Sequence, residues 1–377
     1  MSDEDLRFLD AGVPNRFTEK AELDNLLYNL TTMDGSDVFL MSGRPIFSKI
    51  HSKKKKLSRR VLQSSEMKDI AEIIGGEGTI SDLGSGVAQN ASYSFEKEID
   101  GSTKSYRYRV NMMPCLRDNS RGMTITIRNI PTKIPSTSDL AIDQDMIDLV
   151  RTSRQGMILC VGATGHGKSS TLASLIADRM MFDPDNSNLV TFEDPVEFTY
   201  DYVDTEIKMS TQLEVGRHVK SFTAGLTEAM RMAPDLILVG EIRDYLTMHA
   251  AMSAAVSGHS LFSTLHANNI AETLTRMAGF FPPELQHQAR MDILSSLSMI
   301  VAQRLVPSTD GKRVALREYL ILNNEIRERL LDSDNMAKAS VEITREKGRL
   351  MVDHARQLLD EGRIDLQTFK MASQNYG

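Results

Sequence analysis

Apolar residues follow a helical period and then an alternating period over the first 130 residues. The pattern predicts a helix over residues 18–30, with Thr18 as its candidate cap, whose leucines share one face: Leu23, Leu26, Leu27 and Leu30. It also predicts a strand at 36–42, a short helix closed by glycines at 66–76, and three alternating strands at 92–99, 104–113 and 122–130. Together these elements indicate an α+β domain over residues 1–130.

A second domain is predicted after residues 131–139, a stretch of prolines and hydroxyl-bearing residues that is typical of a linker. Beyond it, helical patterns alternate with apolar runs that are typical of buried strands, at 156–161, 188–194, 235–241 and 260–267. This alternation predicts a parallel sheet with helices on both faces. The chain is then predicted to be mostly helical from about residue 284. The second domain, residues 140–377, is therefore assigned to the α/β class.

The sequence "GATGHGKSS" lies between the first of these apolar runs and a helical pattern. Strand, glycine loop and helix in that order are typical of a phosphate-binding loop, whose backbone N–H groups surround phosphates at a helix N-terminus. We expect Lys168 to reach the β- and γ-phosphates and Ser169 to hold Mg²⁺. A glycine loop that arose by chance is the alternative, and the flanking elements disfavour it. The predicted nucleotide-binding residues are Gly162, Ala163, Thr164, Gly165, His166, Gly167, Lys168, Ser169 and Ser170.

Acidic residues end two of the predicted strands. Glu241 ends the run at 235–241, and in phosphate-loop enzymes such a strand lies beside the loop, where its acid handles Mg²⁺ or the water bound to it. Residues 192–197 contain three carboxylates near the carboxyl edge of the sheet, where ligands bind. Glu193 is predicted to orient or deprotonate the attacking water, and it also belongs to the expected Mg²⁺ environment, partly through water. A solvated turn is the competing interpretation of these acids.

Two histidines and three arginines are weaker candidates. His259 and His266 lie seven residues apart at the two ends of one predicted strand, so they are either structural or sense the γ-phosphate. The residues alone leave both alternatives open. The arginines lie on the predicted N-terminal strands, where composition favours a solvated strand face over a phosphate clamp: Arg109, Arg121 and Arg128.

Composition narrows the class of protein. No apolar run approaches the roughly 20 residues of a spanning helix, and the acidic N-terminus lacks the apolar core of a signal peptide, so a cytoplasmic protein is expected. The two cysteines have no metal-ligand spacing, and a net charge of −7 argues against a whole-surface nucleic-acid binder. One basic run, residues 51–60, is interpreted as a turn or edge strand guarded by lysines, ahead of a contact with acidic lipid or nucleic acid.

Several motifs, in order, resemble the secretion ATPase superfamily that drives type II and type IV secretion and type IV pili. They include the loop, "EDPVEF", "APDLILVGEIRD" and "SGHSLFSTLHANNIAETLTRM", and the resemblance runs from about residue 106 to 282. The chain is most similar to the PilT-like branch and, within it, to the DotB and TraJ ATPases of type IVB secretion and conjugation systems. It departs from the family's assembly motors in lacking a four-cysteine zinc module. It also has His166 where many members have serine, which adds an ionisable group near the phosphates.

The resemblance implies a RecA-like ATPase core preceded by a PAS-like domain, six copies of the chain in a ring, and ATP or ADP with Mg²⁺ as ligands. It implies that Arg109, Arg121 and Arg128 reach a nucleotide at an adjoining interface, which reverses the interpretation from composition. Glu193 becomes the catalytic acid of the aspartate box and Glu241 the acid of the second strand. His259 and His266 become the histidine-box pair.

From this evidence we expect a cytoplasmic, homohexameric ATPase motor of a type IVB secretion or conjugation apparatus, recruited to the inner membrane through other secretion components and not by inserting into lipid. A pilus-retraction motor has the same chemistry and remains an alternative. A DNA-translocating ATPase is a second alternative, although the chain lacks tryptophan and has one basic run. A scaffold that binds nucleotide without hydrolysing it is disfavoured by Glu193 and Glu241.

Overall fold

The computed structural model describes residues 10, 12–50, 53–117, 119–130, 133–183, 187–201 and 208–373. The chain forms two compact units, Met1–Thr132 and Lys133–Gly377, which are described separately below. The first two residues of the predicted linker, 131–132, and the first two of the basic run, 51–52, lie outside the described residues.

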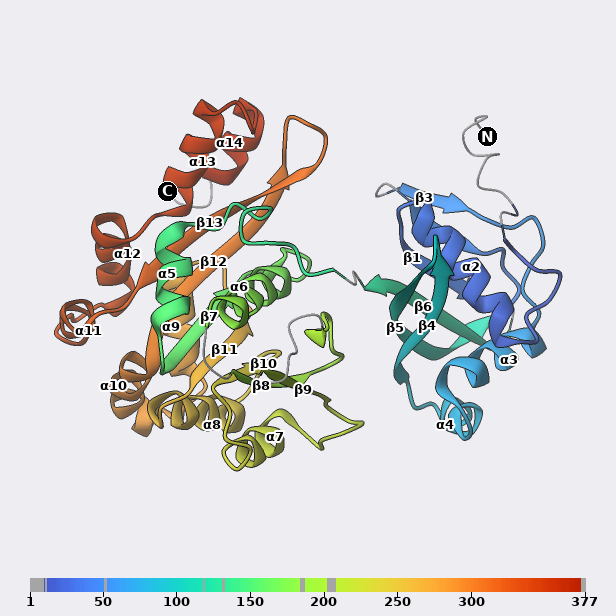
Figure 1. Ribbon diagram of the computed structural model, residues 1–377, viewed down its shortest axis with the longest axis horizontal. Coiled ribbons are helices and arrows are strands. Elements are labelled where there is room, and N and C mark those ends of the chain that lie inside the picture. Colours follow the sequence, from blue (N-terminus) through green and yellow to red (C-terminus); the bar gives the residue numbers. More distant parts are fainter. Residues whose placement is uncertain are drawn as a thin grey trace. The chain divides into compact units, whose positions relative to one another are not determined.

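The first unit is an antiparallel sheet with helices packed against it (Figure 1). Its strands, in sheet order, are β3 (Lys53–Lys56), β2 (Phe47–Ile50), β1 (Gly35–Met41), β6 (Ser120–Ile130), β5 (Ser102–Arg117) and β4 (Gln89–Ile99). Its helices are α2 (Lys20–Thr32), α3 (Ser64–Gly75) and α4 (Thr79–Gly84). Glu19, and not Thr18, caps α2, because Glu19 and Glu22 form a reciprocal capping box.

Alternation along the strands separates a buried face from an exposed one. In β5 and β6 the buried positions include Val110, Met112, Ile125 and Ile127, which join the predicted leucine face of α2 in one core. The lysines of the basic run form β3, an edge strand, which agrees with the edge-strand interpretation.

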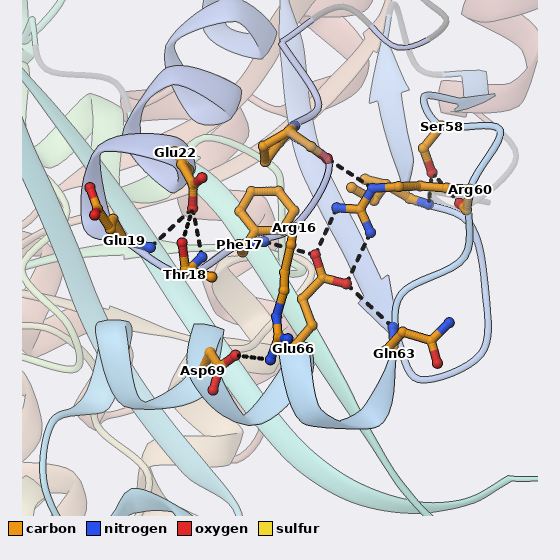
Figure 2. Close-up of polar contacts among 12 residues, drawn as sticks. Arg16, Phe17, Thr18, Glu19, Glu22, Ser58, Arg60, Gln63, Glu66 and Asp69 are labelled. Carbon is orange, nitrogen blue, oxygen red and sulfur yellow. Dashed lines mark hydrogen bonds and ion pairs between the residues drawn. The ribbon is translucent and has the colours of Figure 1, made fainter.

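A buried carboxylate joins three segments of this unit (Figure 2). Glu66 on α3 is 1% exposed, and its oxygens accept hydrogen bonds from the backbone N–H groups of Phe17 and Gln63 at 2.8 and 3.3 Å. The guanidinium of Arg60 donates to both oxygens, at 2.7 and 2.9 Å. Because two backbone N–H groups and the guanidinium of Arg60 all donate to Glu66, this charge is stabilised where burial alone would be costly. The cluster fixes the approach to α2 and the segment before α3.

The second unit is built on a seven-stranded sheet (Figure 1). Its strands, in sheet order, are β13 (Arg313–Ile321), β12 (Leu297–Pro307), β7 (Gly156–Val161), β11 (Ser260–Leu265), β10 (Leu236–Val239), β8 (Asn188–Glu193) and β9 (Met209–Glu214). Neighbouring strands are parallel except β12 and β13, which form an antiparallel pair. The carboxyl ends of the parallel strands therefore meet at one edge, where α/β proteins bind ligands.

Helices cover both faces of this sheet, which confirms the predicted α/β class. Successive residues of β7 enter opposite cores, because Ile158 packs with α5 and α6 whereas Leu159 packs with the helices of the other face. The helices on the two faces and in the C-terminal region are α5 (Gln144–Thr152), α6 (Lys168–Phe182), α7 (Phe222–Ala229), α8 (Tyr245–Val256), α9 (Ile270–Gly279), η2 (Pro283–Leu285), α10 (Gln286–Ser296), α11 (Asn324–Leu331), α12 (Met336–Lys347), α13 (Met351–Asp360) and α14 (Leu366–Ser373).

Two features of this unit were not predicted. Helices account for most of the described residues from 284 onward, as the sequence predicts, but β12 and β13 intervene before the helices resume at Asn324. Most of β12 is buried on both faces, so its sequence has no strand alternation to distinguish it from a buried helix. The strand that precedes Glu241, β10, does not lie beside the strand that carries the glycine loop, because β11 pairs with both and separates them.

Candidate functional site

The glycine loop follows β7 and ends at Lys168, the first residue of α6, as the sequence predicts. Two glycines are required by the backbone. Gly167 precedes the helix with a φ of 77°, in the left-handed region. A Cβ on Gly162 would lie 2.4 Å from the carbonyl oxygen of Gln303 on β12, so no side chain fits there. The loop therefore presents its backbone at the N-terminus of a helix, a geometry that attracts phosphate.

Lys168 lies across this loop. Its Nζ donates hydrogen bonds to the carbonyl oxygens of Gly162 at 2.9 Å and Ala163 at 3.1 Å. Burial lowers the pKa of the ammonium group, while the charges of Glu241 and Glu197 act to raise it. Ser169 follows as the second residue of the helix and is partly buried. The ammonium group of Lys168 is thus held against the loop by two hydrogen bonds to carbonyl oxygens, which phosphate oxygens can replace.

Glu193 ends β8 and is 7% exposed. Its Oε1 accepts a hydrogen bond from the hydroxyl of Thr191 at 2.8 Å, and its Oε2 accepts one from the backbone N–H of Glu197 at 3.2 Å. Burial raises the pKa of this carboxyl group to about 7, and these hydrogen bonds only partly oppose the shift. A carboxyl group with a pKa near neutrality is suited to accept and release a proton.

Glu241 lies two residues beyond β10, the strand next to β8. Its Oε1 accepts a hydrogen bond from Arg243, and its Oε2 lies 3.6 Å from Nε2 of His266. Burial and the charge of Lys168 lower the pKa of His266, which favours the neutral imidazole, and the charge of Glu241 partly opposes this shift. The site therefore brings Glu241, His266 and Lys168 within electrostatic range of one another.

The structure does not bring the two histidines together. His266 follows the carboxyl end of β11, at the same edge as the glycine loop, whereas His259 precedes the amino end of that strand. Six residues of β-strand span about 20 Å. Nδ1 of His259 instead lies 3.2 Å from the carbonyl oxygen of Ala254, at the end of α8.

Of the three candidate arginines, all in the first unit, two lie together and the third lies apart. Arg109 and Arg128 are directly opposite each other on β5 and β6, on the face away from the helices. Nε of Arg128 donates to Asp37 at 2.7 Å, and although burial alone would raise the pKa of Asp37, hydrogen bonds from Arg128 and Ser36 lower it. Arg121 is different, because its guanidinium binds the carbonyl oxygens of Leu83 and Gly84 at the end of α4. Its contacts are those of a helix cap.

A cavity of about 460 Å³ opens beside the glycine loop, and most of its lining was not predicted. The lining includes His166, Asn268, Asn269, Glu272, Gln303 and Arg304. The motif Asn269-x-x-Glu272 has a sequence signal, because it resembles a capping box: the side chain of Asn269 accepts from the N–H of Glu272 at 2.8 Å. Gln303 also has a sequence signal, because it is a polar residue within an apolar run and must find hydrogen-bond partners when it is buried.

His166 lies in the loop as an ionisable group whose charged form is disfavoured. Burial lowers the pKa of its imidazole, and the nearby charges of Arg304 and Lys168 lower it further.

These features agree with comparisons to known proteins. Residues 94–374 match the sequence profile of the family described as "Type II/IV secretion system protein", and the chain belongs to this family. Within the family, it is a member of the PilT-like branch of secretion ATPases. This confirms the resemblance drawn from the motifs.

Type IV pilus ATPases and the ATPase DotB are similar to this chain over most of its length. The type IV pilus ATPase PilU of Pseudomonas aeruginosa is 33% identical over 301 residues, 80% of this chain and 74% of PilU. The X-ray structure of the Legionella pneumophila ATPase DotB is 35% identical, with a TM-score of 0.83, over 96% of this chain and 97% of DotB. The crystal structure of the pilus retraction motor PilT with bound ADP is 29% identical, with a TM-score of 0.78, over 92% of this chain and 96% of PilT.

Within the ranges given above, no three His, Cys, Asp or Glu side chains group together as ligands for a metal ion. No helix among the described residues is both long and apolar enough to cross a membrane.

Proposed function

We propose that this protein is a Mg²⁺-dependent ATPase that works as a homohexameric motor of a type IVB secretion or conjugation apparatus. The observation that carries the ATPase proposal is the glycine loop at the start of α6 with Lys168 folded across it. The likeness to DotB supports the choice of apparatus, because it covers 96% of this chain and includes both units.

In this proposal the triphosphate lies along the loop, against its backbone N–H groups. Nζ of Lys168 leaves the carbonyl oxygens of Gly162 and Ala163 and binds β- and γ-phosphate oxygens, exchanging neutral acceptors for charged ones. The hydroxyl of Ser169 fits a Mg²⁺ ligand, since the remaining ligands of this ion are commonly phosphate oxygens and water. Bound Mg²⁺ would neutralise charge on the phosphates. Glu241 lies near Lys168 and is placed to accept from metal-bound water.

Glu193 is assigned to the attacking water. Its burial raises its pKa to about 7, so a large fraction is ionised at neutral pH and yet binds a proton readily. Thr191 and the N–H of Glu197 fix the direction of the carboxyl group. His266, 3.6 Å from Glu241, is proposed to link the state of the phosphates to the loop after β11. His259, at the far end of that strand, is proposed to act only through the strand.

The proposed ring supplies charge from a neighbouring subunit. Arg109 and Arg128 share an exposed face of the first unit and are proposed to approach a nucleotide held by an adjoining copy, as the family resemblance implies. Arg121 is proposed to act indirectly, by stabilising α4. Nucleotide-dependent movement of the first unit, the PAS-like domain of this proposal, would then transmit force to secretion components at the inner membrane.

Lys168→Gln tests the ATPase proposal. The change removes the charge aimed at the phosphates and keeps the loop backbone, so ATP turnover falls to background while circular dichroism stays unchanged. Steady-state phosphate release measures the effect, and Lys338→Gln, at an exposed position of α12, is a matched control. Turnover at the wild-type rate in Lys168→Gln would contradict the assignment of the loop.

A pilus-retraction motor is the second candidate function, favoured by the likeness to the pilus retraction motor PilT over 92% of this chain. The two functions share their chemistry and differ in partner. Purification of the tagged protein from membranes with ADP or ATP present distinguishes them: secretion-channel proteins support the first, and pilus-assembly proteins the second. A DNA-translocating role would instead require nucleic acid to stimulate turnover, which the net charge of −7 disfavours.

A further inference from the structure

One buried amide connects β12 to the glycine loop. Gln303 is 3% exposed, and its Nε2 donates a hydrogen bond of 2.8 Å to the carbonyl oxygen of His166. Its Oε1 accepts two hydrogen bonds, from the hydroxyl of Thr171 on α6 and from Nε of Arg317 on β13, both at 2.8 Å. Because both donors bind the oxygen, the nitrogen must face the loop, and the orientation of the amide is fixed.

This contact determines which way one peptide of the loop points. A trans peptide is planar, and its C=O and N–H groups point in opposite directions. Since Gln303 holds the carbonyl of His166 toward β12, the N–H of Gly167 points away from β12. An N–H in that direction is available to a phosphate, whereas a flipped peptide would present a carbonyl oxygen and repel it.

Arg317 fixes the amide of Gln303 by donating a hydrogen bond to its oxygen. This arginine is 1% exposed, and its two terminal nitrogens donate hydrogen bonds of 2.8 Å to the carbonyl oxygens of Ala141 and Leu140. Ala141 has a φ of 46°, a conformation that a residue with a Cβ rarely adopts without support. The guanidinium therefore fixes both the loop-directed amide and the turn at the start of the second unit.

We propose that Gln303 is a positioning residue for the phosphate-binding loop and that Arg317 fixes its amide, so that loop geometry depends on the turn at residues 140–141. The proposal rests on the proposed nucleotide site and adds two residues that act through the loop backbone. Through Arg317 and Gln303, the turn at residues 140–141, which directly follows residues 131–139, is connected by hydrogen bonds to the phosphate-binding loop.

The test separates positioning from general stability. Gln303→Glu keeps the acceptor for Thr171 and Arg317 but places a carboxylate oxygen against the carbonyl of His166. We expect ADP affinity, measured by titration of a fluorescent ADP with Mg²⁺, to fall about tenfold, the worth of roughly one buried hydrogen bond. The melting temperature of the nucleotide-free protein should change little, since Arg317 gains a charged partner. Thr171→Val, which removes only the hydroxyl bound to the amide, should lower affinity by a smaller factor.

Arg327 provides the matched control for Arg317. It is also an arginine with partly buried contacts that binds backbone carbonyls, those of Leu294 and Leu297 at 2.9 Å, but it does not contact Gln303. Arg317→Lys should both weaken ADP binding and lower the melting temperature, whereas Arg327→Lys should lower the melting temperature alone. Wild-type ADP affinity in Gln303→Glu, or equal affinities in the two arginine variants, would overturn the proposal. Failure of the wild-type protein itself to bind ADP would instead overturn the proposed function, and this inference with it.

Discussion

The replacement of Glu193 by glutamine should change how the stability of the protein depends on pH. Burial raises the pKa of Glu193 from 4.5 to about 7, so the folded chain binds this proton more tightly than the unfolded chain. Its stabilising contribution is complete below pH 4.5 and is lost as the pH rises through about 7. The difference between the two pKa values is equivalent to about 3 kcal/mol of unfolding free energy.

Glutamine cannot ionise, so Glu193→Gln removes this loss. Relative to wild type, the variant should therefore gain up to about 3 kcal/mol between pH 4.5 and pH 8.5. The glutamine also places an N–H against an existing donor, the N–H of Glu197 or the hydroxyl of Thr191. That cost is the same at both pH values, so it cancels when the difference between the proteins is compared across pH.

The assay is urea denaturation of the nucleotide-free chain at a series of pH values. Circular dichroism is the suitable signal, because the sequence contains no tryptophan. Glu284→Gln, which removes an exposed carboxylate, is the control, and its stability should remain parallel to wild type. If the stabilities of wild type and Glu193→Gln also run parallel from pH 4.5 to 8.5, the raised pKa is refuted, and with it the argument for Glu193 as a base near neutrality.

Three further predictions concern the other candidate residues. Arg128→Ala should depress ATP turnover of the assembled protein at least tenfold, whereas Arg121→Ala should mainly lower the free energy of unfolding, by the roughly 1 kcal/mol of a helix cap; equal losses of turnover would contradict the separation of their roles. His266→Gln should reduce turnover more than His259→Gln in phosphate-release assays, because only His266 lies near Glu241; the reverse order would exclude a role for His266 at the phosphates. Replacement of Lys53–Lys56 by serine should leave recruitment to membranes that contain the other secretion proteins unchanged, since each lysine is worth only about 1 kcal/mol at an anionic surface; fractionation that shows lost recruitment would mean that lipid binds this edge strand directly.

The sequence by itself determined the local features of this protein. The spacing of leucines predicted α2, and the alternation in 104–113 and 122–130 predicted β5 and β6, because helical and strand periods depend only on which positions face a core. The glycine loop was also predictable, since left-handed backbone at Gly167 and close approach at Gly162 both require glycine. The prediction of Thr18 as the cap was wrong, because the helix begins one residue later, at a capping box of Glu19 and Glu22.

Only the tertiary structure decided which distant residues meet. β12 carries a continuous apolar pattern that fits a strand or a buried helix equally, and its pairing with β7 and β13 settles the choice. The same pairing brings Gln303 to the loop, 137 residues away in sequence. His259 and His266 are close in sequence, yet an extended strand separates them, whereas Glu241 and His266 meet because their strands are parallel neighbours. Local pattern records which residues are buried, but strand order, which depends on the packing of the whole sheet, determines what each one contacts.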